Sequence, residues 1–286
     1  MSRRGNSLGK KINNKIFVHI FIIFVGFVMI YPLLWMLSSS FKPSNEIFST
    51  KAFFPKVFTF ENYTIGWQGF SGYSFEHFFI RSFYVTFMSI LGTVLSSSMA
   101  AYAFSKLEFS FRKTLFAIMM LTVMLPHHVT LIPQYIIFNK LHWIDTYLPL
   151  IVPKFFGTQA FFIFLLVQYM RTLPKEITEA AKIDGCSVIG IFIRLIVPLS
   201  VPAIITTAIL NFLWTWNDFF SQLLYLNSVS KFTIAIALRM FIDSSGGSSW
   251  GAMFAMSVLS LVPLFLMFVF FQKYIVDGIT TGAVKG

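Results

Sequence analysis

The sequence predicts an all-α integral membrane protein with six transmembrane helices. Of its 286 residues, 56% are hydrophobic and only 12% are charged, whereas a soluble domain carries about a quarter charged residues. The apolar residues are gathered in runs of roughly 20, the length that a helix needs to cross the hydrocarbon layer. A transmembrane barrel would show short segments of alternating polarity instead.

Six apolar runs have the length of a spanning helix. They are residues 16–37, 83–104, 115–138, 148–169, 195–214 and 253–271. In the second run, Gly92, Ser96 and Ala100 recur at the spacing that lets helices pack closely, and prolines interrupt several of the others. We therefore expect one transmembrane domain over residues 16–272, between an N-terminal segment (1–15) and a C-terminal tail (273–286).

The positions of Lys and Arg indicate how the helices cross the membrane, because short cytoplasmic connections are rich in these residues. With the N-terminus in the cytoplasm, 14 of the 22 basic residues fall inside, 7 fall outside, and Lys154 lies within a span. Both termini are therefore predicted to be cytoplasmic. The net charge of +11 reflects these connections and not a basic face for nucleic acid.

The connection at about 170–194 is predicted to hold a short helix, a sharp turn and a second helix on the cytoplasmic side. Pro174 suits the first turn of a helix. Gly185 is placed to end that helix in a left-handed conformation, and Ser187 is placed to cap the next helix. This connection also contains the lone cysteine, Cys186, which cannot form an internal disulfide.

The same connection carries a recognisable motif. Glu179-Ala180-Ala181 is followed after three residues by Gly185, and after nine more by the segment Leu-Ile-Val-Pro that ends at Pro198. This spacing resembles the EAA loop of ATP-binding-cassette importer permeases, with Leu and Val where the family commonly has Ile and Leu. The two alanines would give the helix a flat face that a partner's groove could accept.

The resemblance extends over nearly the whole chain and is to the second permease of maltose-type carbohydrate importers. Matching segments lie at 31–36, 38–42, 101–106, 131–133, 214–218 and 277–286. The departures are Ser82, which follows Arg81 where many relatives have Asn, and Lys154.

The resemblance implies the type I importer permease fold and a multi-pass place in the cytoplasmic (inner) membrane of a prokaryote. It implies a second permease subunit, most often a different chain, two ATPase subunits and an extracytoplasmic solute-binding protein, which together import an oligosaccharide or glycoside. The residues implied to contact the ATPase are Glu179, Ala180, Ala181, Asp184 and Gly185. Glu179 would be the charged anchor and Gly185 the turn. ATP and magnesium would be bound by the ATPase subunits, and no cofactor by this chain.

The chain is not expected to be an enzyme or a metal protein. It has no GxxxxGK[ST] loop, so it is not the ATPase itself. The adjacent His127 and His128 would not face one site on a helix, and we predict no metal there. A membrane-embedded enzyme would need a catalytic set at membrane depth, and these histidines have no clear partner.

Two polar residues inside the spans are candidates for the substrate pathway. Lys154 could face a water-filled interior, as intramembrane charges commonly do, or its amine could snorkel outward, since it lies only about 9 Å from Leu148. Both interpretations stay open. For Asn211 we favour an interhelical hydrogen bond over a place in the pathway.

The main alternative is a secondary transporter driven by an ion gradient. Such a protein is expected to carry intramembrane carboxylates or paired charges. The six apolar runs contain no Asp or Glu, and the alternative does not explain an EAA loop.

Overall fold

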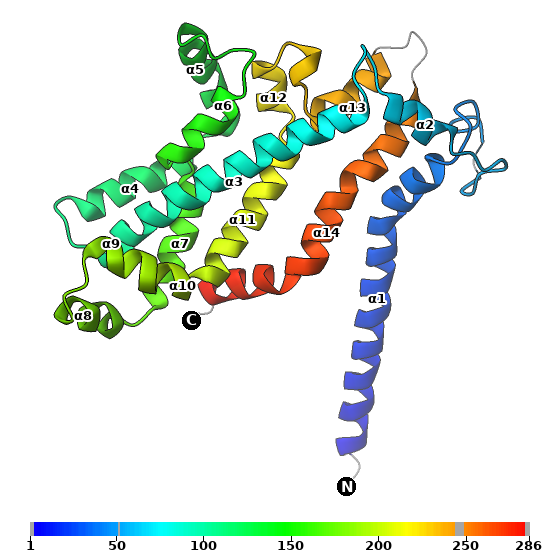
Figure 1. Cartoon of the computed structure of the whole chain (residues 1–286). Helices are drawn as coiled ribbons and strands as arrows, with labels where there is room; N and C mark the ends of the chain where they lie inside the picture. Colours follow the sequence, from blue (N-terminus) through cyan, green and yellow to red (C-terminus); the bar gives the residue numbers. More distant parts are fainter. Residues whose placement is uncertain (1–2, 51, 244–248, 284–286) are drawn as a thin grey trace. The chain divides into compact units, whose positions relative to one another are not determined.

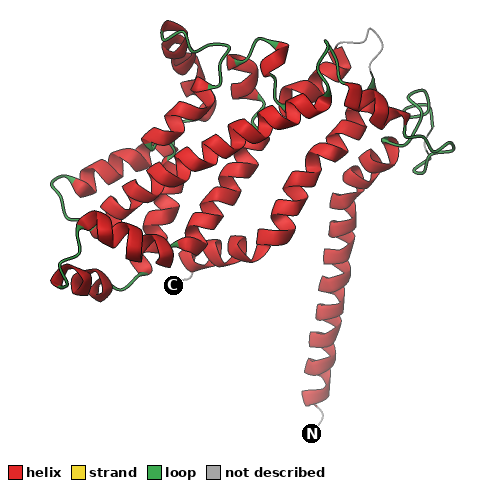
Figure 2. Ribbon diagram, in the orientation of Figure 1, coloured by secondary structure: helices red, strands yellow, loops and turns green. Residues whose placement is uncertain are grey.

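The structure is a computed structural model that describes residues 3–50, 52–243 and 249–283 (Figure 1). In these residues the regular secondary structure is helical (Figure 2), apart from one isolated bridge between Phe70 and Tyr73. The serine- and glycine-rich stretch at 244–248 and the last three residues of the predicted tail lie outside the described residues.

The helices follow one another in this order: α1 (Arg3–Ser39), α2 (Glu61–Gln68), α3 (Phe75–Lys106), α4 (Arg112–Val123), α5 (His127–Lys140), α6 (Leu148–Ile151), η1 (Val152–Phe156), α7 (Ala160–Thr172), α8 (Lys175–Ile183), α9 (Val188–Ile191), η2 (Phe192–Ile196), α10 (Val197–Leu199), α11 (Val201–Trp216), α12 (Phe220–Tyr225), η3 (Val229–Lys231), α13 (Ile234–Asp243) and α14 (Trp250–Ala283). The η elements are 3-10 helices except η2, which is a π-helix.

Four of the six predicted spans are confirmed as long apolar helical stretches. Four stretches of the described chain are long and apolar enough to cross a membrane, namely Ile16–Ser39, Phe75–Lys106, Leu148–Thr172 and Trp250–Tyr274. The number rises to six when each of two bent helix pairs is counted as one span.

The two bent pairs correspond to the predicted runs 115–138 and 195–214, which are not the continuous helices that we expected. α4 and α5 meet at 102°, and the helix ending at Leu199 meets α11 at 76°. Proline explains both breaks, because it has no N–H to donate to the carbonyl four residues earlier. Pro126 stands directly before α5, and Pro202 lies in the first turn of α11.

The chain divides into two compact units. The first comprises the described residues of Met1–Gln68 and Phe241–Leu259. Within it, the amide of Asn62 donates to the carbonyls of Ser40 and Lys42, at 2.8 and 2.7 Å. A Cβ at Gly251 would lie 2.1 Å from the Asn62 side chain, so this close approach requires glycine.

The second unit comprises the described residues of Gly69–Met240 and Ser260–Gly286. Its centre is α3, which contacts α7, α11 and η1. As the small-residue spacing predicts, Gly92 faces the Phe155 ring so closely that an added Cβ would lie 2.6 Å from it. The hydroxyl of Ser96 donates to the Lys154 carbonyl at 2.7 Å. Small side chains thus let α3 pack against the backbone of η1.

Candidate functional site

The predicted helix, turn and helix of the 170–194 connection are present. α8 begins directly after Pro174, which occupies the N-cap position and not the first turn itself. Thr178 and Ala181 are buried, and Ala181 joins the core formed with α3 and α7. Glu179 and Ala180 are exposed on the other side of the helix. The helix therefore has one face fixed in the unit and one face available to a partner.

The turn after α8 is a Schellman motif. Gly185 has φ = +78°, the left-handed conformation that glycine adopts without steric cost. The Gly185 N–H donates to the Lys182 carbonyl at 3.1 Å, and the Cys186 N–H donates to the Ala181 carbonyl at 2.9 Å. These two bonds define the motif. Asp184 is the exposed C-cap residue. The left-handed conformation predicted for Gly185 is confirmed.

The second helix begins as predicted. The Ser187 hydroxyl accepts a hydrogen bond from the Gly190 N–H at 3.1 Å, which is the usual contact of an N-cap serine. The chain then continues through the π-helix η2 and α10 to the bend before α11. A π-helical turn commonly marks a functional position within a helix, and here it lies between the exposed loop and an apolar helix.

α3 holds both ends of this loop through two residues to which the sequence analysis gave no role. Near the end of α3, the Lys106 amine donates to the Leu173 carbonyl at 2.7 Å, just before α8. One turn earlier, the buried Tyr102 hydroxyl donates to the Val188 carbonyl at 3.2 Å, just after the turn. Both residues lie in segment 101–106, which resembles the family, and this resemblance was the only sign in the sequence that they have a role.

The exposed surface of the loop combines charged and apolar side chains. Ile183, the last residue of α8, is 86% exposed, and Ile189 on α9 is 70% exposed. Glu179 adds a negative charge. Glu179 and Ile183 are four residues apart on α8 and so lie on one face of the helix, which offers a partner both a charge and an apolar side chain.

The structure places Asn211 inside the helix packing of the second unit. Its side chain is fully buried. Its amide nitrogen donates to the Thr93 hydroxyl and to the Gln159 side-chain carbonyl, both at 3.1 Å. Its oxygen accepts from the Ser89 hydroxyl at 3.1 Å. Asn211 therefore joins α3, α11 and the start of α7, which favours the interhelical hydrogen bond over a place in the pathway.

Lys154 lies in η1, where the predicted fourth span is broken. Gly157, which follows η1, has φ = +66°, and α7 begins only at Ala160. The Lys154 side chain is partly exposed and forms no hydrogen bond or salt bridge with a described residue. Irregular backbone at membrane depth occurs where it is buried in protein or lines a water-filled cavity.

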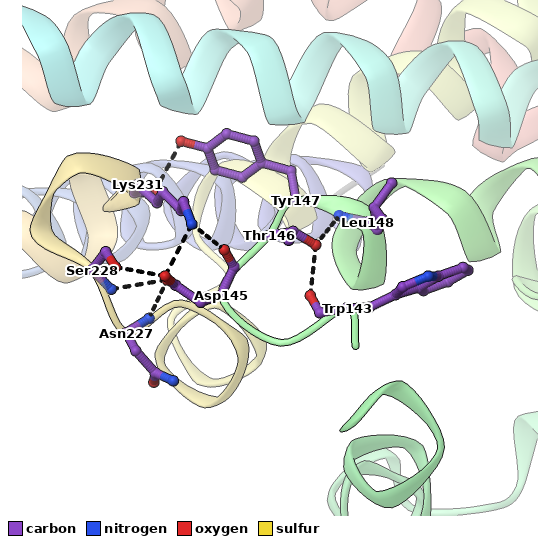
Figure 3. A network of polar contacts seen from close by, with 8 residues as sticks. All are labelled: Trp143, Asp145, Thr146, Tyr147, Leu148, Asn227, Ser228 and Lys231. Carbon is purple, nitrogen blue, oxygen red and sulfur yellow. Dashed lines mark hydrogen bonds and ion pairs between the residues drawn. The ribbon is translucent and has the colours of Figure 1, made fainter. Parts of the chain in front are cut away.

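At the other end of α3, Asp145 joins two distant connections (Figure 3). Its carboxylate accepts from the backbone N–H groups of Asn227 and Ser228, each at 2.9 Å, and from the Lys231 amine at 2.9 Å. The Ser228 hydroxyl donates to it as well. Burial alone would raise the pKa of Asp145, but the hydrogen bonds from Ser228, Lys231 and Asn227 outweigh burial and hold it well below its ordinary value. Asp145 is therefore an ionised structural anchor.

Comparison with known proteins agrees with this arrangement. Residues 92–280 match the family described as "Binding-protein-dependent transport system inner membrane component". The chain is 34% identical over 275 residues to the arabinooligosaccharides transport system permease protein AraQ of Bacillus subtilis, covering 95% of this chain and 96% of that protein. It is 34% identical over 265 residues to the trehalose/maltose transport system permease protein MalG of Thermococcus litoralis, with 92% and 94% covered.

One solved structure shows the same fold. It belongs to a bacterial ABC transporter involved in the import of the acidic polysaccharide alginate, and it matches with a TM-score of 0.80 at 22% identity over 96% of this chain and 98% of that one. The family match and the relatives show that the chain belongs to the binding-protein-dependent transport system inner membrane components. With its several long apolar helices, it is a multi-pass permease subunit of an ATP-binding-cassette importer.

Proposed function

We propose that this permease imports an oligosaccharide or glycoside across the inner membrane of a prokaryote, together with a second permease, two ATPase subunits and a solute-binding protein. The assignment of a sugar as the cargo is supported by the arabinooligosaccharide and trehalose/maltose permeases. Each of them shares about a third of its residues with this chain over most of the length. The single observation that carries the ATP-driven mechanism is the exposed, rigidly held α8 loop.

In the proposed mechanism, α8 is the coupling helix and sits in a groove of an ATPase subunit. Glu179 supplies a charge, Ala180 a flat surface and Ile183 an apolar anchor, all three exposed in this chain. When the ATPase subunits close on ATP, α8 moves with them. Because Lys106 and Tyr102 bond to the two flanks of the loop, the movement passes directly to α3.

The second path from the loop runs along the chain itself. α9, η2 and α10 lead from the turn to the bend of 76° before α11. A π-helical turn next to a proline bend can change its angle without breaking long helices. We infer that α3 and α11 move together, since the buried Asn211 links them through Ser89 and Thr93.

We also place Lys154 in the substrate pathway. The Lys154 carbonyl accepts a hydrogen bond from Ser96 on α3. Ser96 follows Arg81 by fifteen residues, so the two are separated by about 22 Å at the rise of an α-helix. A lysine side chain does not span that distance, so Lys154 does not reach the Arg81 end of α3. A charge that faced lipid at this depth would be costly, which supports a position facing the water-filled interior of the assembled transporter.

The orientation rests on the charge count, which puts both termini and α8 in the cytoplasm. A cysteine that replaces Ser7, with Cys186 changed to Ser, should resist membrane-impermeant thiol reagents in intact cells. It should react after the cells are permeabilised. Labelling from outside would place α8 on the side opposite to the ATPase and overturn the proposal.

The docking of α8 is tested by Ile183→Asp. Because Ile183 is 86% exposed, the change leaves the fold of this chain intact and removes the proposed apolar anchor. We expect the ATPase to be lost from the purified complex and uptake to fall at normal membrane expression. Phe111→Asp is the matched control, since Phe111 is 77% exposed on the connection before α4. Retention of the ATPase by the Ile183 variant would refute this role of α8.

A further inference from the structure

Arg81 is a cation without a complete set of partners. It lies in the second turn of α3, at the end of the helix away from α8. Its Nε is buried and has no hydrogen-bond partner among the described residues. A guanidinium keeps its charge at every physiological pH. A buried donor on a charged group that lacks an acceptor is costly to maintain, and in a native protein it calls for an explanation.

The nearby carboxylate cannot serve Arg81. Asp145 is occupied by four donors from Asn227, Ser228 and Lys231. One of those donors is itself a cation, so Lys231 and Asp145 neutralise each other. The charge of Arg81 is therefore not balanced by this pair.

Two tyrosines stand beside Arg81. Tyr84 follows it by three residues on α3, which places both on one face of the helix. The Tyr84 ring lies 5.7 Å from the Tyr147 ring at an interplanar angle of 59°, and Tyr84 is 46% exposed. Burial raises the pKa of Tyr147, while the charge of Arg81 acts on the same group in the opposite direction, so the guanidinium and the phenol are close.

This combination fits one ligand chemistry. A guanidinium binds a carboxylate through parallel hydrogen bonds, and its geometry makes it the preferred partner for planar anions. The face of a tyrosine ring offers the flat apolar surface against which a pyranose ring packs. A sugar unit that carries a carboxylate would satisfy both features at once.

We propose that Arg81, with Tyr84 and Tyr147, receives a uronate unit of the cargo, so that this importer carries an acidic saccharide. The inference rests on the proposed function and names the substrate class of that pathway. Lys154 lies on η1, where its carbonyl is bonded to Ser96, about 22 Å from Arg81 along α3 by the helical rise, and is a second cation on the proposed pathway. An anionic lipid headgroup would offer Arg81 the same charge without the sugar ring, and the experiment separates the two sources.

The test uses the whole importer in proteoliposomes with its solute-binding protein. The probes are trisaccharides of galacturonate, glucuronate and mannuronate, each paired with its methyl ester, which keeps the shape and removes the charge. Neutral trisaccharides complete the panel. Melting shifts of the binding protein first show which probes it binds, and uptake of each bound probe is then measured for the wild type and for Arg81→Gln, Arg81→Lys and Arg239→Gln.

We expect Arg81→Gln to lower uptake of an acidic probe by roughly tenfold to a hundredfold, the usual effect of losing a hydrogen bond to a charged group. Arg81→Lys should restore part of the loss. Arg239→Gln should change little, because Arg239 is an exposed cation that lies over the Phe219 ring. Uptake of the methyl ester should be the same in all four proteins.

Two results would overturn the inference. If Arg81→Gln lowers uptake of acidic and neutral probes equally, Arg81 binds a lipid or supports the fold. If the importer carries neutral saccharides only, the cargo is not acidic, while the proposed sugar import stands. An importer that carries no saccharide of either kind would overturn both.

Discussion

The two ends of the second unit are stabilised in different ways. Around α8, the turn and the cap are built from hydrogen bonds between neighbours, such as Cys186 to Ala181 and Gly190 to Ser187. Around Asp145, the connections are held by hydrogen bonds to Asn227 and Ser228, which lie 82 and 83 positions further along the chain. The turn and the cap at the α8 end are therefore formed locally, while the bonds of Tyr102 and Lys106 attach the loop to α3. The opposite end keeps its form only while two distant parts of the chain stay together.

The largest expected effect concerns the local turn. Gly185→Val places a β-branched residue in the left-handed region, which costs about 1–2 kcal/mol or more. No atom lies within 4 Å of the added Cβ, so the effect comes from the backbone conformation and not from a clash. We expect uptake to fall below roughly a tenth of the wild-type rate at near-normal membrane expression.

Gly185→Asn is the matched control, because Asn tolerates the left-handed conformation far better than Val. It should retain most of the uptake. Equal losses for Val and Asn would show that side-chain volume, and not the turn, is what matters at this position.

The second effect concerns the long-range anchor. Asp145→Ala removes the acceptor of four hydrogen bonds and leaves Lys231 without its carboxylate. We expect the free energy of unfolding to fall by about 1–3 kcal/mol and trypsin to cleave more readily after Lys231. Thr146→Val, which removes only contacts within the same connection, should leave that cleavage unchanged. If both variants expose Lys231 alike, the long-range bonds are not what holds the connection.

A smaller effect is expected where the two ends are linked through α3. Tyr102→Phe removes the hydroxyl that donates to the Val188 carbonyl, a bond that contributes about 0.5–1.5 kcal/mol. The loop should keep its fold but transmit movement less well, so that uptake per ATP hydrolysed falls roughly two- to tenfold. Tyr169→Phe is the control, because its hydroxyl makes a longer bond of 3.4 Å to Leu199. If Tyr102→Phe leaves uptake per ATP hydrolysed unchanged, Tyr102 does not transmit movement from the loop to α3.

The smallest effect is that of moderate acid on the Asp145 anchor. The pKa of Asp145 is lowered in the folded state, so its contribution is fully present above the unfolded-state value of about 3.9. It is lost only as the pH falls through the lower folded-state pKa. Cleavage after Lys231, measured relative to cleavage of an unstructured peptide at the same pH, should therefore be the same at pH 7 and pH 5, and a higher ratio at pH 5 would contradict the assignment.

The difference between the two ends also explains what the sequence predicts. Gly185 and Ser187 could be assigned because their partners lie within five residues, where turn and cap preferences apply. Asp145 could not be assigned, because its partners near Asn227 are brought close only by the tertiary fold. Tyr102 was found in a family-like segment, but its bond to Val188 was not foreseeable.

The breaks in the helices were only partly predictable from the sequence. Pro126 and Pro202 were visible in the sequence, yet proline alone does not say whether a helix bends or ends. The break after η1 had a signal as well, since Gly157 lies within the predicted run and glycine commonly ends a helix in the left-handed conformation. Most of the fold was therefore predictable from hydrophobic runs, whereas the positions of the bends required the structure.

The central claim is that α8 is the element that contacts the ATPase, and a disulfide cross-link tests it most directly. Ile183→Cys, with Cys186→Ser, would be combined with single cysteines along the exposed groove of the ATPase subunit and oxidised with and without ATP. We predict a cross-link from position 183 whose yield changes on ATP binding. A cysteine replacing Phe111, which is also largely exposed, should give none. An importer that takes up sugar at the normal rate while position 183 forms no cross-link at any point of the groove would contradict the account.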